Sequence, residues 1–325
     1  MGKWPLRFRS IALILFLCIF VGTVHAQGLF LPGEVRPGLR GVAKTVISGN
    51  TIETFDVEVL GLVPQSPPLD NLIMIRVSGD VVERSGGIAQ GMSGTPVYIQ
   101  DRLLGAIAYT YAQTDHRIGL VTPAVDMFKI YEQLTVPAPV LPPGATAVRS
   151  PLIVQGLNDR NKRFLTEALG EERVQVMPAL ASSYVYGPLV LEPGSMIGVQ
   201  LLRGDFQVAS FGTVTDVRED GRFVAFGHPF THRGAVDFFA SAAYVHYTLP
   251  SLDMPFKIVS LGSTIGQIGQ DRAVGLGGTL GNHVEYVSVA MKVRDRDRNV
   301  DQNFNVEVVK EPTIMVPLVI TSAYQ

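Results

Sequence analysis

The sequence predicts a mainly β protein made of two β-rich halves with one or two short helices. Three observations support this fold class. The 325 residues include 33 glycines and 21 prolines, which favours many turns and short strands over long helices. Several segments alternate apolar and polar residues with the period of a half-buried strand. Charged residues make up only 17% of the chain, which argues against a disordered or coiled-coil protein.

Residues 1–26 have the pattern of a secretory signal peptide. Three basic residues precede an unbroken apolar run over 11–21, and Val24-His25-Ala26 supplies small residues at the two positions that a signal peptidase reads. The apolar run is short for a membrane span, which needs about 20 residues. We therefore expect cleavage after Ala26 and an exported protein, with a membrane contact only if the signal stays uncleaved.

Removal of the signal changes the composition in two ways. It takes away Cys18, the only cysteine, so the mature chain is expected to have no thiol catalysis, disulfide bond or thiolate metal site. It also removes three of the 27 basic residues and none of the 29 acidic ones, so the formal net charge falls below −2. Such a chain has no basic field to hold nucleic acid, and no nucleic-acid partner is expected.

The first half, residues 27–136, is expected to form a β-barrel that carries a serine motif. β-Branched stretches flank Ser48-Gly49-Asn50, which is the signature of a hairpin within residues 40–60. Further elements are expected in order along this half: strands at 72–77, 96–99 and 103–109, and a short helical segment at 124–134.

Residues 137–150 are rich in proline and predict an extended linker between the halves. The second half, residues 151–325, is expected to be β-rich and to carry a histidine motif. It begins with a capped helix over 158–169 that ends at Gly170. Strands are then expected at 198–202, 206–215 and 222–226. The alternating segment 284–309 is expected to form two strands on either side of a polar turn at 294–299, and a last strand is expected at 314–320.

The segment Gly91-Met92-Ser93-Gly94-Thr95-Pro96 has the residues that a serine nucleophile needs. Glycines on both sides of Ser93 allow a tight turn and the close approach of a substrate backbone. The N–H groups of Gly91 and Ser93 are the candidate donors of an oxyanion hole. The alternative is an ordinary Gly-Ser loop of a β protein, but the strand, turn and strand that follow favour the nucleophile.

His228 is the candidate general base, because an apolar strand over 224–226 ends in a glycine and then this histidine. The alternative is a structural histidine at a strand end, and His232 is the reserve candidate. His228, His232 and Asp237 could also be interpreted as metal ligands, but their spacing fits no strong metal pattern. No metal and no cofactor are therefore expected.

Two blocks of the sequence resemble the SpoIVB-type serine peptidase family. Residues 86–96 with Leu103-Leu104-Gly105-Ala106 are similar to its nucleophile region, and Gly212-Thr213-Val214-Thr215 with 223–228 is similar to its histidine region. The resemblance implies a chymotrypsin-like fold of two six-stranded β-barrels with the site between them. It also implies a bacterial exported protein, in the periplasm, cell envelope or medium, with Ser93 as nucleophile and His228 as general base.

The chain departs from this family in the order of its blocks and in its acidic residue. The serine block precedes the histidine block here, which suggests that the two barrels are exchanged along the chain. The family's aspartate lies somewhat before the serine, where Asp80 is the candidate, and Asp237 after His228 is the alternative. No PDZ segment is evident before the peptidase part.

The sequence thus predicts a serine endopeptidase with a Ser/His(/Asp) site that acts on a peptide or protein substrate, with narrow processing or signalling specificity. The alternative is a peptidase-fold module, weakly catalytic or non-catalytic, that binds a peptide or an envelope protein.

Overall fold

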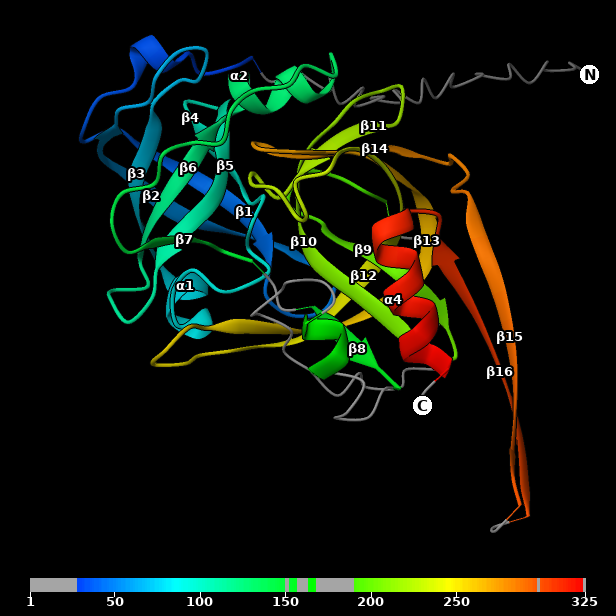
Figure 1. Ribbon diagram of the computed structural model, residues 1–325. Helices are drawn as coiled ribbons and strands as arrows, with labels where there is room; N and C mark the ends of the chain where they lie inside the picture. The colour runs from blue at the N-terminus through cyan, green and yellow to red at the C-terminus, as the bar shows by residue number, and fades with distance from the viewer. Residues whose placement is uncertain (1–27, 150–151, 157–162, 168–189, 297–298, 324–325) are drawn as a thin grey trace, which may run out of the picture.

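The computed structural model describes residues 28–149, 152–156, 163–167, 190–296 and 299–323. The predicted signal peptide lies outside these residues. Of the helix predicted over 158–169, only 163–167 are described, and they are helical. The strands form two sheets that lie side by side in Figure 1, with the first half of the chain in one and the second half in the other.

The first sheet closes into a six-stranded barrel. Its strands pair in the order β4-β1-β2-β3-β6-β5, and β5 pairs with β4 to complete the ring. The predicted hairpin is confirmed, because Val46 at the end of one strand pairs with Ile52 at the start of the next. The strands of this barrel are β1 (Arg40–Val46), β2 (Ile52–Val63), β3 (Leu72–Ser78), β4 (Pro96–Ile99), β5 (Arg102–Tyr111) and β6 (Ile118–Pro123).

The core of this barrel follows the alternation in the sequence. Along β2, Phe55, Val57 and Val59 are buried in a cluster with residues from every other strand of the ring. Asp56, between two of them, is exposed to solvent. The two-residue period therefore fixes which face of β2 lines the barrel.

The second sheet also contains a ring of six strands, since β9 pairs both with β12 and with β10. The prediction of a mainly β protein with two β-barrel halves is confirmed. The ring consists of β9 (Met196–Gly204), β10 (Gln207–Val217), β11 (Arg222–Ala225), β12 (Gly234–Leu249), β13 (Phe256–Arg272) and β14 (Gly275–Leu280).

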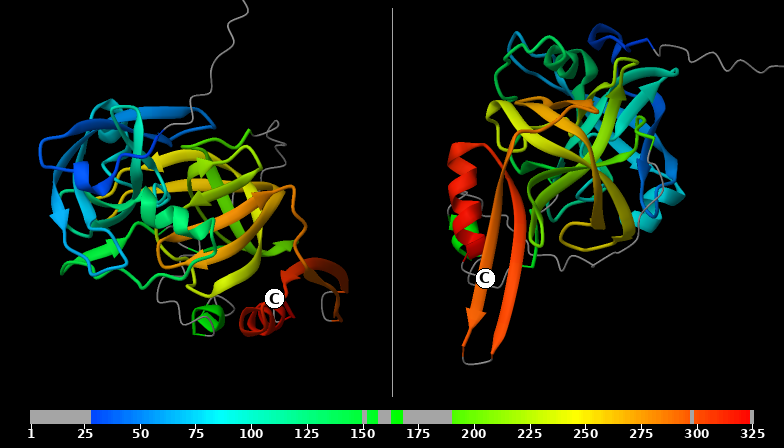
Figure 2. Two further views of the ribbon diagram at one scale, coloured as in Figure 1. Left: turned by 90° about the horizontal axis from the view of Figure 1, so that it is seen from above. Right: turned by 90° about the vertical axis from the view of Figure 1, so that its right-hand side faces the viewer.

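Four strands extend these rings. β7 (Ala145–Ala147) lies inside the predicted linker and pairs with β5, while β8 (Ile153–Gln155) pairs with β10. The chain therefore passes from the first sheet to the second between these two strands. β15 (Tyr286–Asp295) and β16 (Val300–Val309) form a long hairpin, which Figures 1 and 2 show extending well past the second barrel.

The helices are short and lie outside the barrels. Besides the helical residues 163–167, they are η1 (Pro32–Glu34), α1 (Asp80–Ser85), α2 (Ala124–Met127) with η2 (Phe128–Ile130), and α4 (Pro312–Ala323). The segment 124–134 is thus partly helical, as its spacing predicts. No helix among the described residues has the length and apolar character that crossing a membrane requires.

The prediction of a strand at 314–320 is wrong, because this segment lies within α4. Pro312 takes the first helical position, where its missing N–H costs nothing. Ile314 and Leu318 lie four residues apart and are buried against the core of the second barrel. An apolar run of this length does not by itself distinguish a strand from a buried helix face.

Backbone hydrogen bonds between described residues join the two barrels. The tip of the β1–β2 hairpin pairs with β12, where Gly49 and Val245 exchange two hydrogen bonds of 2.6 and 3.1 Å. On the serine loop, Gln90 pairs with the start of β13, since the N–H of Lys257 donates to the Gln90 carbonyl at 3.1 Å. The serine loop is therefore anchored directly to the second barrel.

Candidate active site

Ser93 lies on the loop that leads from α1 into β4, and the backbone of this loop is tightly turned. Gly91 and Gly94 both have a φ of 92°, a conformation that strongly favours glycine. The N–H of Met92 donates to the carbonyl of Ala89 at 2.8 Å, and that of Thr95 donates to Met92 at 3.0 Å. The glycines on both sides of the serine thus allow the turn, as the sequence predicts.

Three polar groups of this loop have no hydrogen-bond partner among the described residues. The N–H groups of Gly91 and Ser93 donate to no backbone or side-chain acceptor there, although both residues are buried. The Ser93 Oγ is also buried without a partner. Because buried polar groups are normally satisfied, three unsatisfied groups within three residues mark a place where a ligand could be bound.

Two threonines of β10 hold the serine loop against the second barrel. The Thr213 hydroxyl donates to the Gly91 carbonyl at 2.9 Å, and the Thr215 hydroxyl donates to the Gly94 carbonyl at 2.8 Å. The Thr213 N–H also donates to the Ser93 carbonyl at 2.7 Å. The carbonyls of Gly91, Ser93 and Gly94 are therefore held by β10, while the N–H groups of Gly91 and Ser93 are not.

His228 follows β11 through a sharp turn that faces the first barrel. Phe226 and Gly227 both have a φ of 70°, which for a bulky residue such as phenylalanine costs about 1–3 kcal/mol. The Gly227 carbonyl accepts a 2.7 Å hydrogen bond from the hydroxyl of Thr122 in β6. The His228 ring lies 6.3 Å from the ring of Tyr109, centroid to centroid. The histidine and serine segments are thus each bonded to the opposite barrel.

The backbone next to His228 determines which ring nitrogen carries the proton. The Nδ1 atom lies 2.8 Å from the carbonyl oxygen of Pro229, which is only an acceptor. Nδ1 therefore donates, and Nε2 is the nitrogen with the lone pair. In a Ser/His/Asp site an aspartate carboxylate fixes the same tautomer.

A buried aspartate that the sequence did not single out holds the segment after His228. The Asp271 carboxylate accepts hydrogen bonds from the N–H of Phe230 at 2.9 Å and from the N–H and hydroxyl of Thr231, each at 2.6 Å. Asp271 lies near the end of β13 and is fully buried. No local pattern in the sequence points to Asp271, because the two N–H groups that donate to its carboxylate lie 41 and 40 positions earlier in the chain.

The acidic and histidine candidates from the sequence lie elsewhere. The Asp80 side chain, at the start of α1, is 80% exposed and forms an ion pair with Arg84. The Asp237 carboxylate accepts hydrogen bonds from Gln267 and from the N–H of Glu285. His232 is exposed on the turn before β12. Within the described part of the chain, no group of three or more His, Cys, Asp or Glu side chains could hold a metal ion.

Both candidate side chains are closed off from solvent. Ser93 is 0% exposed and His228 is 1% exposed. The fold thus brings the serine loop and the histidine turn to one interface between the barrels, but the Ser93 Oγ forms no hydrogen bond with a described residue there. A peptide would reach Ser93 only after this interface opens.

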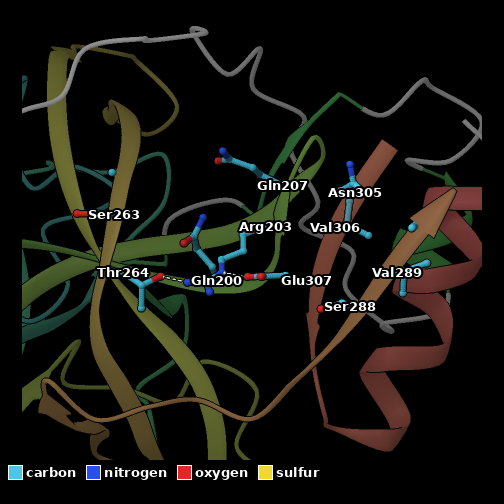
Figure 3. A pocket seen from close by; sticks show the side chains of 13 residues that line it. Gln200, Arg203, Gln207, Ser263, Thr264, Ser288, Val289, Asn305, Val306 and Glu307 are labelled. Carbon is cyan, nitrogen blue, oxygen red and sulfur yellow. Dashed lines mark hydrogen bonds and ion pairs between the residues drawn. The ribbon is translucent and has the colours of Figure 1, made fainter. Parts of the chain in front are cut away.

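A separate cavity of about 610 Å³ lies in the second half of the chain (Figure 3). Arg203 projects into it and pairs with Glu307 at 2.6 Å and with the Thr264 hydroxyl. The Glu307 carboxylate offsets the charge of the guanidinium, and the rest of the lining mixes amide and hydroxyl groups with apolar side chains. It contains neither Ser93 nor His228.

Comparison with known proteins gives one match. Residues 30–123 match the family model described as SpoIVB peptidase S55, a family of serine peptidases. The matched segment contains β1–β6 and Ser93, and it ends well before His228. No curated protein and no solved structure matches the chain.

Proposed function

Because residues 30–123 belong to the SpoIVB-type family of serine peptidases, we propose that this protein is an endopeptidase with Ser93 as nucleophile and His228 as general base. One observation supports this most strongly: the Ser93 Oγ and the N–H groups of Gly91 and Ser93 are buried without partners, on a loop whose carbonyls are all held. Those are the groups that acyl transfer uses.

The proposed reaction follows from these positions. The Ser93 oxygen attacks the substrate carbonyl carbon while the Nε2 of His228 takes its proton. The negative charge on the carbonyl oxygen is stabilised by the N–H groups of Gly91 and Ser93. His228 then protonates the leaving amine, and water releases the acyl group from Ser93 by the same steps.

The proposal assigns the orientation of His228 to the Pro229 carbonyl rather than to Asp80. The Nδ1–Pro229 distance of 2.8 Å supports this, because it already fixes the tautomer. The Asp80 carboxylate is largely solvated and paired with Arg84. Asp271 supports the same turn by fixing the two residues after Pro229.

The test is covalent labelling of the mature chain, residues 27–325, with a small fluorophosphonate. Labelling is expected in the wild type, absent in Ser93→Ala and strongly reduced in His228→Ala. Ser263→Ala, which changes an exposed serine, and Asp80→Asn are expected to label like the wild type. A wild type that is folded by circular dichroism and stays unlabelled over many hours would overturn the proposal.

A second candidate function is a binding module that uses the same fold for a peptide or an envelope protein. The burial of Ser93 and His228 favours this alternative, because a serine that no substrate can reach in the closed protein performs no hydrolysis. In that case a bound peptide stays intact, and Ser93→Ala binds it as well as the wild type. Hydrolysis that is lost in Ser93→Ala excludes a purely binding role.

We also propose that the protein is exported and acts on few substrates. The basic start, the apolar run and the small residues up to Ala26 support export. The closed site supports narrow specificity, since only a substrate that opens the barrel interface would be cleaved.

A further inference from the structure

Lys257 is a fully buried lysine with no carboxylate partner in the part of the chain that the structure describes. It is the second residue of β13 and is 0% exposed. A buried amino group without a counter-ion is costly to the fold, and proteins rarely keep one without a use. Because the amino group is removed from water, burial lowers the pKa of Lys257 to about 7.

The amino group of Lys257 is directed at the serine loop. Its Nζ lies 3.3 Å from the Gly91 carbonyl oxygen, 3.0 Å from the Thr45 hydroxyl and 3.2 Å from the Met196 sulfur. These three atoms come from the loop, β1 and β9 respectively, so Nζ links the nucleophile loop to both barrels. The main chain of Lys257 is bonded to the same loop through Gln90.

Lys257 and Thr213 converge on one carbonyl. The Gly91 oxygen accepts from Nζ and, at 2.9 Å, from the Thr213 hydroxyl. Two donors on one oxygen fix the plane of the peptide between Gly91 and Met92. A rotation of this peptide would change the ψ of Gly91 and the path of the chain into Ser93, and with it the relative placement of the Gly91 and Ser93 N–H groups.

We infer that Lys257 is a positioning residue of the proposed peptidase site, whose protonated amino group holds the Gly91 peptide in the orientation that sets the oxyanion donors. This inference rests on the proposed function. Lys257 acts through the backbone of Gly91, and its amino group forms no hydrogen bond with Ser93 Oγ.

The charge on Lys257 matters because a charge-assisted hydrogen bond is roughly twice as strong as a neutral one. The groups that face Nζ are the Thr45 hydroxyl from β1, the Met196 thioether from β9 and the Gly91 carbonyl, and none of them titrates. No described charged side chain contributes to the lowered pKa. Loss of the proton therefore weakens the hold on Gly91, and the labelling rate is expected to fall as the pH rises above about 7.

The test is the fluorophosphonate labelling rate between pH 5.5 and 9.5. Lys257→Met removes the donor and keeps a side chain of similar length. For this variant we expect labelling at least tenfold slower than in the wild type at pH 6, and a labelling rate that does not decline above pH 7. Thr213→Val removes the other donor to the Gly91 oxygen, and we expect slower labelling that still declines above pH 7. Lys292→Met, at an exposed position of β15, is the matched control and is expected to behave like the wild type.

The outcomes separate the two claims. A labelled wild type whose rate and alkaline decline persist in Lys257→Met overturns the role of Lys257 and leaves the peptidase proposal intact. An unlabelled wild type overturns the peptidase proposal, and the role of Lys257 with it. Unfolding curves for each variant show whether slow labelling comes from lost structure. Thr213→Val tests the hold on the Gly91 carbonyl in a protein that keeps Lys257.

Discussion

At the scale of single residues, the candidate site depends on backbone groups that are fixed by side chains from the opposite barrel. Hydroxyls of Thr213 and Thr215 and the amino group of Lys257 hold the carbonyls of the serine loop. The sequence singled out Ser93, Gly91 and the glycines beside them. It gave no role to the two threonines or to the lysine, because their partners lie more than 100 residues away in the chain.

At Gly94 the backbones of the two barrels approach each other too closely to leave room for a side chain. A methyl group at Gly94 would overlap the carbonyl oxygen of Thr213 and the amide nitrogen of Phe226, and its φ of 92° is unfavourable for alanine. Gly94→Ala is therefore expected to lower the free energy of unfolding by more than the roughly 1–3 kcal/mol of backbone strain alone. Denaturant unfolding measures this change.

Gly49→Ala is the control for the Gly94 prediction. Gly49 also has a positive φ, of 69°, but no atom lies within 4 Å of its added methyl group. Gly49→Ala should therefore lower the free energy of unfolding only by the cost of backbone strain, about 1–3 kcal/mol. Equal losses in the two variants would show that the overlap at Gly94 is relieved without cost.

The titration of Lys257 predicts how stability depends on pH. Its pKa is about 7 in the folded protein and near 10.5 in an exposed lysine, so the unfolded chain binds more protons between these values. The free energy of unfolding then rises with pH from about 7 to about 10 through this residue. Lys257→Met should remove this part of the rise, as urea unfolding at several pH values would measure. Parallel curves for the two proteins would contradict a lowered pKa.

At the scale of elements, most strands follow from local pattern, and the exceptions have physical reasons. β2 and the β15–β16 hairpin lie close to their predicted ranges, because each buries one face and exposes the other. β10 also lies close to its predicted range, but it is an apolar strand that is buried on both faces. α4 was predicted as a strand, since its apolar run has no period that distinguishes the two states. The turn after β11 was predicted only as a strand end, although its conformation is what presents His228 to the first barrel.

Asp271 links β13 to the histidine turn, and this link is testable. Asp271→Asn replaces one acceptor oxygen by an NH2 group that faces the N–H groups of Phe230 and Thr231. We expect a loss of about 1–3 kcal/mol in the free energy of unfolding, because buried donors lose their acceptor. The labelling rate of Ser93 should fall as well, since His228 loses its support.

The control for Asp271 is Asp253→Asn, which changes an exposed aspartate on the β12–β13 turn. It should leave both the unfolding curve and the labelling rate unchanged. An Asp271→Asn protein that is less stable but labels at the wild-type rate would limit Asp271 to a structural role.

At the scale of the whole molecule, two barrels meet along an interface that contains every proposed catalytic group. The serine block comes from the first barrel in the chain and the histidine block from the second, as their order in the sequence suggests. Figure 1 shows the two barrels side by side, and hydrogen bonds from β10, β12 and β13 join the second barrel to the first. A closed interface of this kind explains why Ser93 and His228 are both buried.

Export also concerns the whole molecule, because signal cleavage would determine whether the folded protein carries residues 1–26. When the full chain is expressed in a bacterium, we expect the mature protein to begin at Gln27 and to be found outside the cytoplasm. N-terminal sequencing of the purified protein measures the cleavage site, and replacing Ala26 by a bulky residue is expected to block processing. A full-length N-terminus on exported protein would instead support an uncleaved anchor.

The sequence by itself determined the mainly β character, most strand positions, the serine motif and the histidine at a strand end. These depend on local period and on short-range turn chemistry, which neighbouring residues record. Only the tertiary structure decided that Thr213, Thr215 and Lys257 hold the serine loop, that Asp271 supports the histidine turn, and that Asp80 lies in solvent. Such contacts join residues far apart in the chain, and the closure of two barrels against each other, rather than any local pattern, brings them together.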